Sequence, residues 1–386
     1  MRRGALIALL TAAAVLLGGC SEIDQAENLA FVVLMGVDQT EDGGIELSVQ
    51  VPKISGSRGN GEDSGSSGDL VFTASGGDFA EAITALKWIV PRRLDLSQIE
   101  LIVVSEALAS SGRWLEVMND MMQTSRLYTA ARLAVCDGDV QAFIRAEKPL
   151  IGTRIADELT AMFEAYTTDG FVPNTSFADI YYKSISAYSD PVAVYAVPAP
   201  EESSADVEPA SQDAAEPAVA IIPDDPGTTD VETEQETRFL GAAVFRDGRM
   251  VGKLDGRTLM YCKLLRGKSQ TFVFAHGGEE VSLSTLGTPS VSVDTASEPV
   301  RIQVDLRLAV LPNNGPLEYP GLADALEAEL MKAVDACKAI GAEPFQFAEV
   351  AARRFATLDD WIAYGWRERF IDSEVEINVD LKIENL

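Results

Sequence analysis

Cysteine and histidine have the most versatile side-chain chemistry, and both are scarce in this chain. Its 386 residues include four cysteines and one histidine. Cys20 differs from the others because it directly follows an apolar run, whereas Cys136, Cys262 and Cys337 lie far apart inside apolar patterns. These three are expected to be small buried hydrophobic residues. A disulfide between two of them would leave one thiol over, and the sequence does not choose the pair.

The first nineteen residues have the layout of a secretory signal. Arg2 and Arg3 provide the positive start, and the run from Ala5 to Leu17 is uncharged and apolar. This run is shorter than the roughly 20 residues that a membrane-spanning helix needs. We therefore predict that residues 1–19 are removed.

Cys20 is the predicted site of covalent modification. The sequence Leu17-Gly18-Gly19-Cys20 has the form of a bacterial lipobox, which predicts cleavage between Gly19 and Cys20. The Cys20 thiol then takes a diacylglyceryl group, and the new amine takes an acyl chain. Two chains make a stable anchor, so we predict a protein tethered to the outer face of a bacterial membrane. An ordinary signal with a chance cysteine is the alternative, but the cysteine falls where the apolar run stops.

The remaining sequence offers no catalytic or metal-binding constellation. The single histidine, His276, cannot make a typical zinc site, and no Gly-x-Ser-x-Gly motif is present. The glycine-rich stretch 56–61 does not fit the dinucleotide-binding pattern. Adjacent acids such as Asp359-Asp360 are more typical of a solvated or capping position than of a glycosidase pair. We predict no enzyme activity, no metal and no cofactor apart from the covalent lipid.

Charge and composition limit the classes of partner that this chain could bind. The formal net charge is −29, and such a field repels nucleic acid phosphates. Hydrophobic residues make up 47% of the chain, which is typical of a folded protein. The length predicts two or three domains.

Residues 20–198 show strand and helix patterns in alternation. Phe31 to Val37 and Ile45 to Val51 are predicted to form a hairpin around Asp42-Gly43-Gly44. Asp78 and Glu81 are predicted to cap a helix, and a Gly/Ser-rich loop is expected at 55–68. Further elements are expected at 70–74, 99–104, 114–122, 133–136, 155–166, 177–185 and 192–197.

Residues 199–237 break this pattern. They contain twelve acidic residues and five prolines, but no Lys, Arg, Phe, Trp or Tyr. Such a composition cannot build a core, so we predict an acidic disordered linker. The scattered acids do not have the spacing of a calcium loop, which is the alternative.

Residues 238–386 are predicted to form the C-terminal domain. A hairpin is expected around Asp247-Gly248, followed by strands, a long amphipathic helix at 322–340, helical stretches containing 347–355 and 358–366, and a last strand at 375–381. With the N-terminal region at 20–198, the whole is predicted to be α+β, with mixed sheets flanked by helices. Whether the N-terminal region is one domain or two is left open.

Four stretches of the sequence together resemble the Ger(x)C family of spore germination lipoproteins, the C subunits of spore germinant receptors. They follow the lipobox in the family's order: Gly36-Val37-Asp38 after an apolar strand, Pro91-Arg92-Arg93-Leu94 leading to 99–106, Gly241-Ala242-Ala243-Val244-Phe245 with Val251-Gly252-Lys253-Leu254, and Trp366 four residues before Phe370. Gln98 and the stretch 344–347 depart from the family pattern.

The resemblance implies a non-catalytic subunit at the spore inner membrane, needed for nutrient-triggered germination. Its implied partners are A-type and B-type integral membrane subunits, and the lipid bilayer through the acyl anchor. Neither the germinant nor the partner-binding surface is indicated. The alternative is a solute-binding lipoprotein of a membrane transporter, which would also be tethered and acidic.

Two features could be structural or could contact a partner. Arg92 and Arg93 form a basic pair in an acidic neighbourhood, where an internal ion pair is the favoured interpretation. The aromatic residues Trp361, Tyr364, Trp366 and Phe370 are expected to belong to the core rather than to a docking surface.

Overall fold

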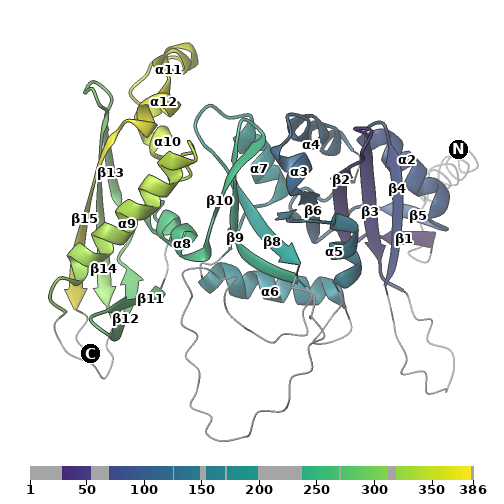
Figure 1. Cartoon of the computed structure of the whole chain (residues 1–386), viewed down its shortest axis with the longest axis horizontal. Coiled ribbons are helices and arrows are strands. Elements are labelled where there is room, and N and C mark those ends of the chain that lie inside the picture. Colours follow the sequence, from purple (N-terminus) through teal and green to yellow (C-terminus); the bar gives the residue numbers. More distant parts are fainter. Residues whose placement is uncertain are drawn as a thin grey trace, which may run out of the picture.

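The computed structural model describes residues 28–53, 69–124, 126–147, 154–169, 172–198, 237–268, 271–311 and 319–383. Their strands form an eight-stranded sheet, a five-stranded sheet and a two-stranded pair, with helices packed against the sheets (Figure 1). The predicted α+β class is therefore confirmed. Among the described helices, none combines the length and apolar character that crossing a membrane requires.

The larger sheet has the strand order β10-β9-β8-β7-β6-β2-β3-β4. Its strands are β2 (Leu34–Gln39), β3 (Ile45–Val51), β4 (Leu70–Gly76), β6 (Leu101–Ser105), β7 (Arg132–Cys136), β8 (Val192–Pro198), β9 (Thr237–Arg246) and β10 (Arg249–Leu254). The central strands β2, β6, β7 and β8 run parallel, and antiparallel strands complete both ends. The predicted hairpin of β2 and β3 is confirmed.

Helices cover both faces of this sheet. One face carries α2 (Phe79–Ile89), α3 (Glu106–Ser110), α4 (Trp114–Gln123) and α7 (Phe177–Ser184), and the other carries α5 (Val140–Ala146) and α6 (Ile155–Asp169). Every residue of β6 is buried, because a parallel strand covered on both sides has no solvent face. This explains its continuous apolar sequence.

Helix α2 begins as predicted, with one difference in its cap. The Asp78 carboxylate accepts a hydrogen bond of 2.8 Å from the backbone N–H of Glu81. The Glu81 carboxylate accepts from the N–H of Gly77 at 2.9 Å, one residue before the position that a capping box would use. Both bonds satisfy N–H groups at the start of the helix.

The five-stranded sheet surrounds β14. Its strands are β11 (Thr271–His276), β12 (Glu279–Thr285), β13 (Ser290–Asp294), β14 (Arg301–Val310) and β15 (Glu374–Ile383). β15 runs parallel to β14 along its full length, while β12 and β13 pair antiparallel with it. The alternating sequence of β14 buries Ile302, Val304, Leu306 and Leu308, as a period of two requires.

Helix α9 (Leu322–Ala339) covers this sheet, and its buried residues include Leu322, Leu326 and Leu330, one turn apart. The smaller helices are α8 (Gly256–Leu265), α10 (Phe347–Ala352), α11 (Leu358–Tyr364) and α12 (Trp366–Ile371). The helical stretch predicted at 358–366 is therefore two helices. Gly365 between them has φ 66°, a left-handed conformation that ends α11.

The hairpin of β9 and β10 belongs to the larger sheet. Asp247 and Gly248 both have positive φ, as expected for the tight turn that suits a hairpin. β9 pairs with β8, and Thr237 faces Pro198 in that pairing. The acidic segment thus connects two neighbouring strands of one sheet. The described residues leave out 1–27, which include the predicted signal at 1–19, and 54–68, which include the predicted Gly/Ser-rich loop at 55–68. They also leave out 199–236, nearly all of the predicted acidic linker at 199–237. The domain boundaries stay a prediction.

The structure also locates the remaining cysteines and the aromatic residues. Cys136, Cys262 and Cys337 are free and buried, as expected of small hydrophobic residues. In the aromatic group, Trp361, Trp366 and Phe370 are buried in the core. The prediction that this group belongs to the core is therefore confirmed, and it does not form a docking surface.

The two-stranded pair joins β1 (Leu29–Phe31) to β5 (Arg93–Asp95) in parallel.

Candidate functional site

The predicted lipid-attachment site precedes the part of the chain that the structure describes. Gly19 and Cys20 fall before Asn28, the first described residue. The cleavage and the covalent lipid therefore stay predictions from the sequence.

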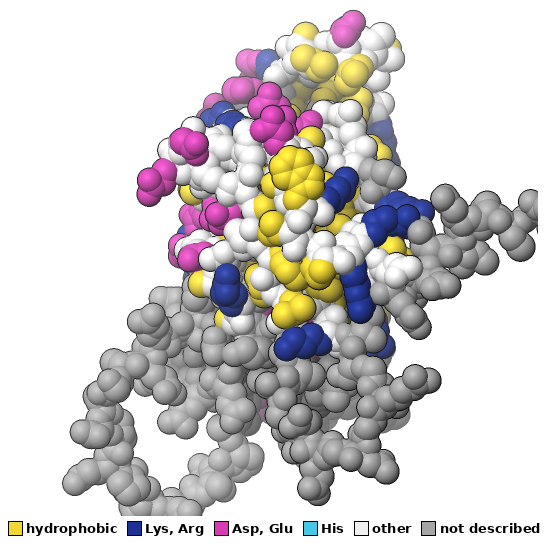
Figure 2. Space-filling model, turned by 90° about the vertical axis from the view of Figure 1, so that its right-hand side faces the viewer, with side chains coloured by type: hydrophobic (Ala, Val, Ile, Leu, Met, Phe, Trp, Pro, Cys, Tyr) yellow, Lys and Arg dark blue, Asp and Glu magenta, His cyan; other side chains and the backbone are white. Residues whose placement is uncertain are grey.

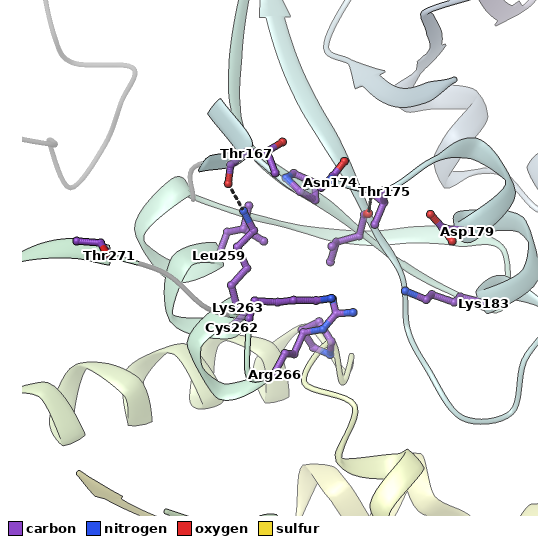
Figure 3. Close-up of a pocket in the computed structure, with 14 residues that line it drawn as sticks. Thr167, Asn174, Thr175, Asp179, Lys183, Leu259, Cys262, Lys263, Arg266 and Thr271 are labelled. Atoms are coloured by element: carbon purple, nitrogen blue, oxygen red, sulfur yellow. Dashed lines mark hydrogen bonds between the residues drawn. The ribbon is translucent and has the colours of Figure 1, made fainter. Parts of the chain in front are cut away.

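A cavity of about 870 Å³ lies between α8 and the segments that flank α7. It is lined by four cations, Lys183 of α7, Lys263 of α8, Arg266 at the C-cap of α8 and Lys268, together with Asp179. Figure 3 shows the ends of Lys183 and Arg266 directed toward the same space, while the end of Lys263 reaches toward Thr167. In a chain of net charge −29, such a concentration of positive charge is unusual.

Two of these cations come from α8: Lys263 lies in its last turn and Arg266 is its C-cap. Asp255 caps the helix by accepting a 2.8 Å hydrogen bond from the N–H of Thr258. Leu264 and Leu265 are buried and hold the helix in the core. Lys263 and Arg266 are three residues apart, a spacing that places them on one face.

Lys263 joins α8 to the segment around α6. Its Nζ donates hydrogen bonds to the backbone carbonyls of Val172 at 2.8 Å and Thr167 at 3.4 Å. Burial, with a smaller contribution from the charge of Arg266, lowers the pKa of Lys263 to about 8. The ammonium group is thus held by carbonyl dipoles while a like charge lies nearby.

Arg266 and Lys183 are also kept partly away from water. Burial lowers the pKa of Arg266, opposed mainly by the charge of Glu343. Burial and then the charge of Arg266 lower the pKa of Lys183. The Nε of Arg266 is buried without a hydrogen-bond partner among the described residues, although buried donors are nearly always satisfied.

This arrangement is suited to binding an anion rather than to proton or group transfer. Neighbouring cations that repel one another gain stability when an anion is placed between them. The thiol of Cys262 is no nucleophile at neutral pH, because burial raises its pKa well above the ordinary value. Asp179 is already engaged with Ser176 in the capping box of α7. No group of three or more metal-ligating side chains occurs within the described ranges.

A buried carboxylate network lies beside the cavity. Glu343 is 3% exposed, and its two oxygens each accept a 3.0 Å bond, from the N–H groups of Phe347 and Ala348. Burial raises the pKa of Glu343 to about 8. Its own backbone N–H donates to Asp190 at 2.8 Å, and Arg367 lies 3.4 Å from Asp190. This network connects the start of α10 to the larger sheet.

Of the residues named from sequence, Cys262 lines this cavity, whereas Arg92, Arg93 and His276 lie away from it. Arg92 and Arg93 are exposed and line a second hollow with Asn28. His276 ends β11, where its Nε2 lies 2.9 Å from the carbonyl oxygen of Pro320. The cavity was not predicted because Lys183 lies about 80 residues before Lys263 and Arg266 in the sequence, and no sequence pattern connects the two helices.

Comparison with known proteins gives two family matches in order along the chain. The family described as "Spore germination protein N-terminal domain" matches residues 24–197. The family described as "Spore germination B3/ GerAC like, C-terminal" matches residues 240–386. Together they cover most of the chain.

Individual relatives are more distant. The chain is 26% identical over 139 residues to "Spore germination protein KC" of Bacillus subtilis (strain 168), an alignment that covers 35% of this chain and 34% of that protein. The chain therefore aligns with about a third of the length of this relative. A solved structure described as "Crystal Structure of the GerBC protein" superposes with a TM-score of 0.48 at 11% identity, covering 91% of this chain and 97% of that one.

Proposed function

We propose that this chain, which belongs to the GerAC family of spore germination proteins, is a lipid-anchored, non-catalytic subunit of a germinant receptor at the spore membrane. The observation that carries the proposal is the ordered match of both family domains to residues 24–197 and 240–386. The lipobox at Cys20 lies just before the first of them. A tether there would leave the whole folded part outside the bilayer.

The proposed partners are A-type and B-type integral membrane subunits of the receptor. A protein held at the membrane by a lipid tether would communicate with the membrane interior through such partners. The test is a crosslinked pull-down of the tagged chain from membranes of dormant spores, followed by mass spectrometry. Recovery of two polytopic membrane proteins is expected. Recovery of a permease and an ATPase would instead indicate the transporter alternative.

The anchor is tested by labelling with radioactive palmitate in a host that processes lipoproteins. The intact chain should take up the label, and the mass of its N-terminal peptide should begin at a modified Cys20. A Cys20→Ala variant should take up none. Ser21→Ala, which keeps the thiol, is the matched control and should be labelled normally. Equal labelling of Cys20→Ala and the intact chain would refute the anchor.

A second candidate function, binding of a small anion, is favoured by the cavity between α7 and α8. Its cations Lys183, Lys263 and Arg266 line one space, and a bound ligand stabilises the folded state in proportion to its affinity. A thermal-shift series with phosphate and simple carboxylates tests this function. The shift should be lost in Arg266→Gln and kept in Arg249→Gln, an exposed residue of β10. No shift with any of these anions would exclude the function for this class of ligand.

A further inference from the structure

The end of the molecule that carries β4 and α2 has an unusual surface. Figure 2 shows hydrophobic side chains gathered there, with Lys and Arg side chains beside them and acidic side chains mainly in another part of the view. Trp88 on the last turn of α2 is 82% exposed, and its neighbour Ile89 is 48% exposed. Leu70, at the start of the edge strand β4, is also exposed. Large exposed hydrophobic side chains that gather in this way usually mark an interaction surface.

Trp88 is the exception among the tryptophans. The chain has four, and the other three, Trp114, Trp361 and Trp366, are at most 5% exposed. An indole ring contributes a large apolar area and a polar N–H. It therefore favours the boundary between water and a bilayer, where one side is apolar and the other wet.

Basic side chains border the exposed hydrophobic ones, although the protein as a whole carries a net charge of −29 (Figure 2). Lys87 and Arg92 are exposed, and with Arg93 they surround a hollow of about 700 Å³. The acidic residues of α2, Asp78 and Glu81, are at its other end. A Lys or Arg close to an anionic lipid surface contributes about 1 kcal/mol to binding. The excess negative charge farther away is screened beyond about 10 Å at moderate ionic strength.

The chain enters the folded part on this same face. Asn28 lines the hollow with Lys87 and Arg92, and Leu29 pairs with Arg93. From Cys20 to Asn28 the chain advances eight residues, which reach at most about 26 to 29 Å when fully extended. An anchor on Cys20 would hold this face close to the bilayer and would leave the far sheet with β15 distant from it (Figure 1).

We propose that this face docks on the lipid bilayer. Trp88 and Ile89 enter the interfacial layer, while Lys87 and Arg92 contact the phosphates of anionic headgroups. The inference rests on the lipid anchor of the proposed function, because the tether supplies the proximity that two basic and two hydrophobic side chains alone would not. It fixes which end of the subunit faces the membrane and which end is free to meet a partner.

The experiment uses the full lipidated chain, purified from a lipoprotein-processing host and reconstituted in two kinds of vesicle. One kind is phosphatidylcholine, and the other contains phosphatidylglycerol as well; both have brominated acyl chains that quench nearby tryptophan. Flotation with the vesicles reports the anchor, and quenching of tryptophan fluorescence reports docking. Trp88→Phe gives the background from the three buried tryptophans.

The expected result is flotation in both lipids, with quenching and a blue shift that require Trp88 and are stronger with phosphatidylglycerol. Lys87→Glu and Arg92→Glu should each reduce the ratio of docked to undocked protein at least fivefold, since about 1 kcal/mol corresponds to that factor. Lys332→Glu on α9, whose side chain is 72% exposed at the opposite end, is the matched control and should leave quenching unchanged.

Two results would overturn the inference, and only one of them would also refute the lipid anchor. Flotation with unquenched Trp88 would leave the anchor intact and refute the docking face. Loss of flotation would refute the anchor and the docking face together. If Trp88 were shielded from aqueous iodide in spore membranes but unquenched by brominated lipid, the face would be a contact for a protein.

Discussion

Replacing Glu343 by Gln should remove most of a specific pH dependence of stability. The Glu343 carboxyl is buried, and its pKa is raised from 4.5 to about 8 chiefly by that burial. Between these two values the folded protein holds a proton that the unfolded chain has released. Stability therefore falls as pH rises from about 4.5 to about 8, and it is flat with respect to this group outside that window.

The size of the effect follows from the difference in pKa. At 1.36 kcal/mol for each pKa unit, Glu343 lowers the free energy of unfolding by about 4 to 5 kcal/mol between the two ends of the window. The neighbouring charged groups are Asp190, Arg266 and Arg367, of which Asp190 also has a raised pKa because of burial. More than one carboxyl therefore contributes to the dependence of the free energy of unfolding on pH. The contribution of Glu343 is the difference in that dependence between the native chain and Glu343→Gln.

Glutamine keeps the shape of the side chain but cannot ionise. It can accept from only one of the two N–H groups, of Phe347 and Ala348, that the carboxylate oxygens now satisfy. The unpaired donor costs about 1 to 3 kcal/mol. Glu343→Gln is therefore expected to be less stable than the native chain at pH 5, and equal or more stable at pH 8.

Urea unfolding at several pH values from 5 to 8 measures this slope. Glu349→Gln, at an exposed position on α10, is the matched control and should keep the native slope. An unchanged slope in Glu343→Gln, measured with the same m-value, would show that the buried carboxyl does not hold the proton and would refute the reasoning.

Three further outcomes follow from local geometry. Gly241→Ala should lower the free energy of unfolding in urea by more than about 3 kcal/mol, because φ is 70° and the new Cβ would lie 2.1 Å from the carbonyl oxygen of Leu254. Gly287→Ala is the control: φ is also positive there, but the space around it is open, so the loss should be about 1 kcal/mol. Cys262 and Cys337 should resist mild oxidation at neutral pH although their sulfur atoms are 3.8 Å apart, because both are buried and burial raises the pKa of Cys262. Peptide mapping after treatment with oxidised glutathione should find both thiols free, and a Cys262–Cys337 disulfide would contradict this. Deleting residues 203–233 should leave a single cooperative unfolding transition, since Pro198 and Thr237 are already paired. The shorter loop should raise the free energy of unfolding by about 1 to 2 kcal/mol. A second, separate unfolding transition would contradict this.

The sequence predicts most of the individual elements, because their signals are local. The alternation of β14 and the period of α9 depend only on which side chains face the core, so both are readable without the fold. The Asp247-Gly248 turn is similarly determined by two residues that accept positive φ. The break between α11 and α12 is harder to predict, since Gly365 is equally compatible with a helix interior at modest cost.

What the sequence does not predict are relations between distant segments. Lys183 and Arg266 belong to helices far apart in the chain, and each alone is typical of a solvated surface position. Glu343 stands between an alanine and a proline with no recurring pattern, so its burial and its raised pKa exist only once α10 packs against Asp190. The pairing of β8 with β9 is likewise invisible, because an acidic segment separates the two strands.

Strand β9 explains why the two halves of the sequence do not form independent bodies. Its side chains alternate between opposite faces: Ala243 and Phe245 join the core beneath α2 and α4, while Ala242 and Val244 join the core of the C-terminal sheet. The bonds from Glu343 to Asp190 and from Arg246 to the carbonyl of Gly341 reinforce this junction. A strand shared by two cores cannot leave one without exposing the other. The end that the tether would hold and the end that would be free are thus coupled through β9, so a load or ligand at either end acts on a single folded unit.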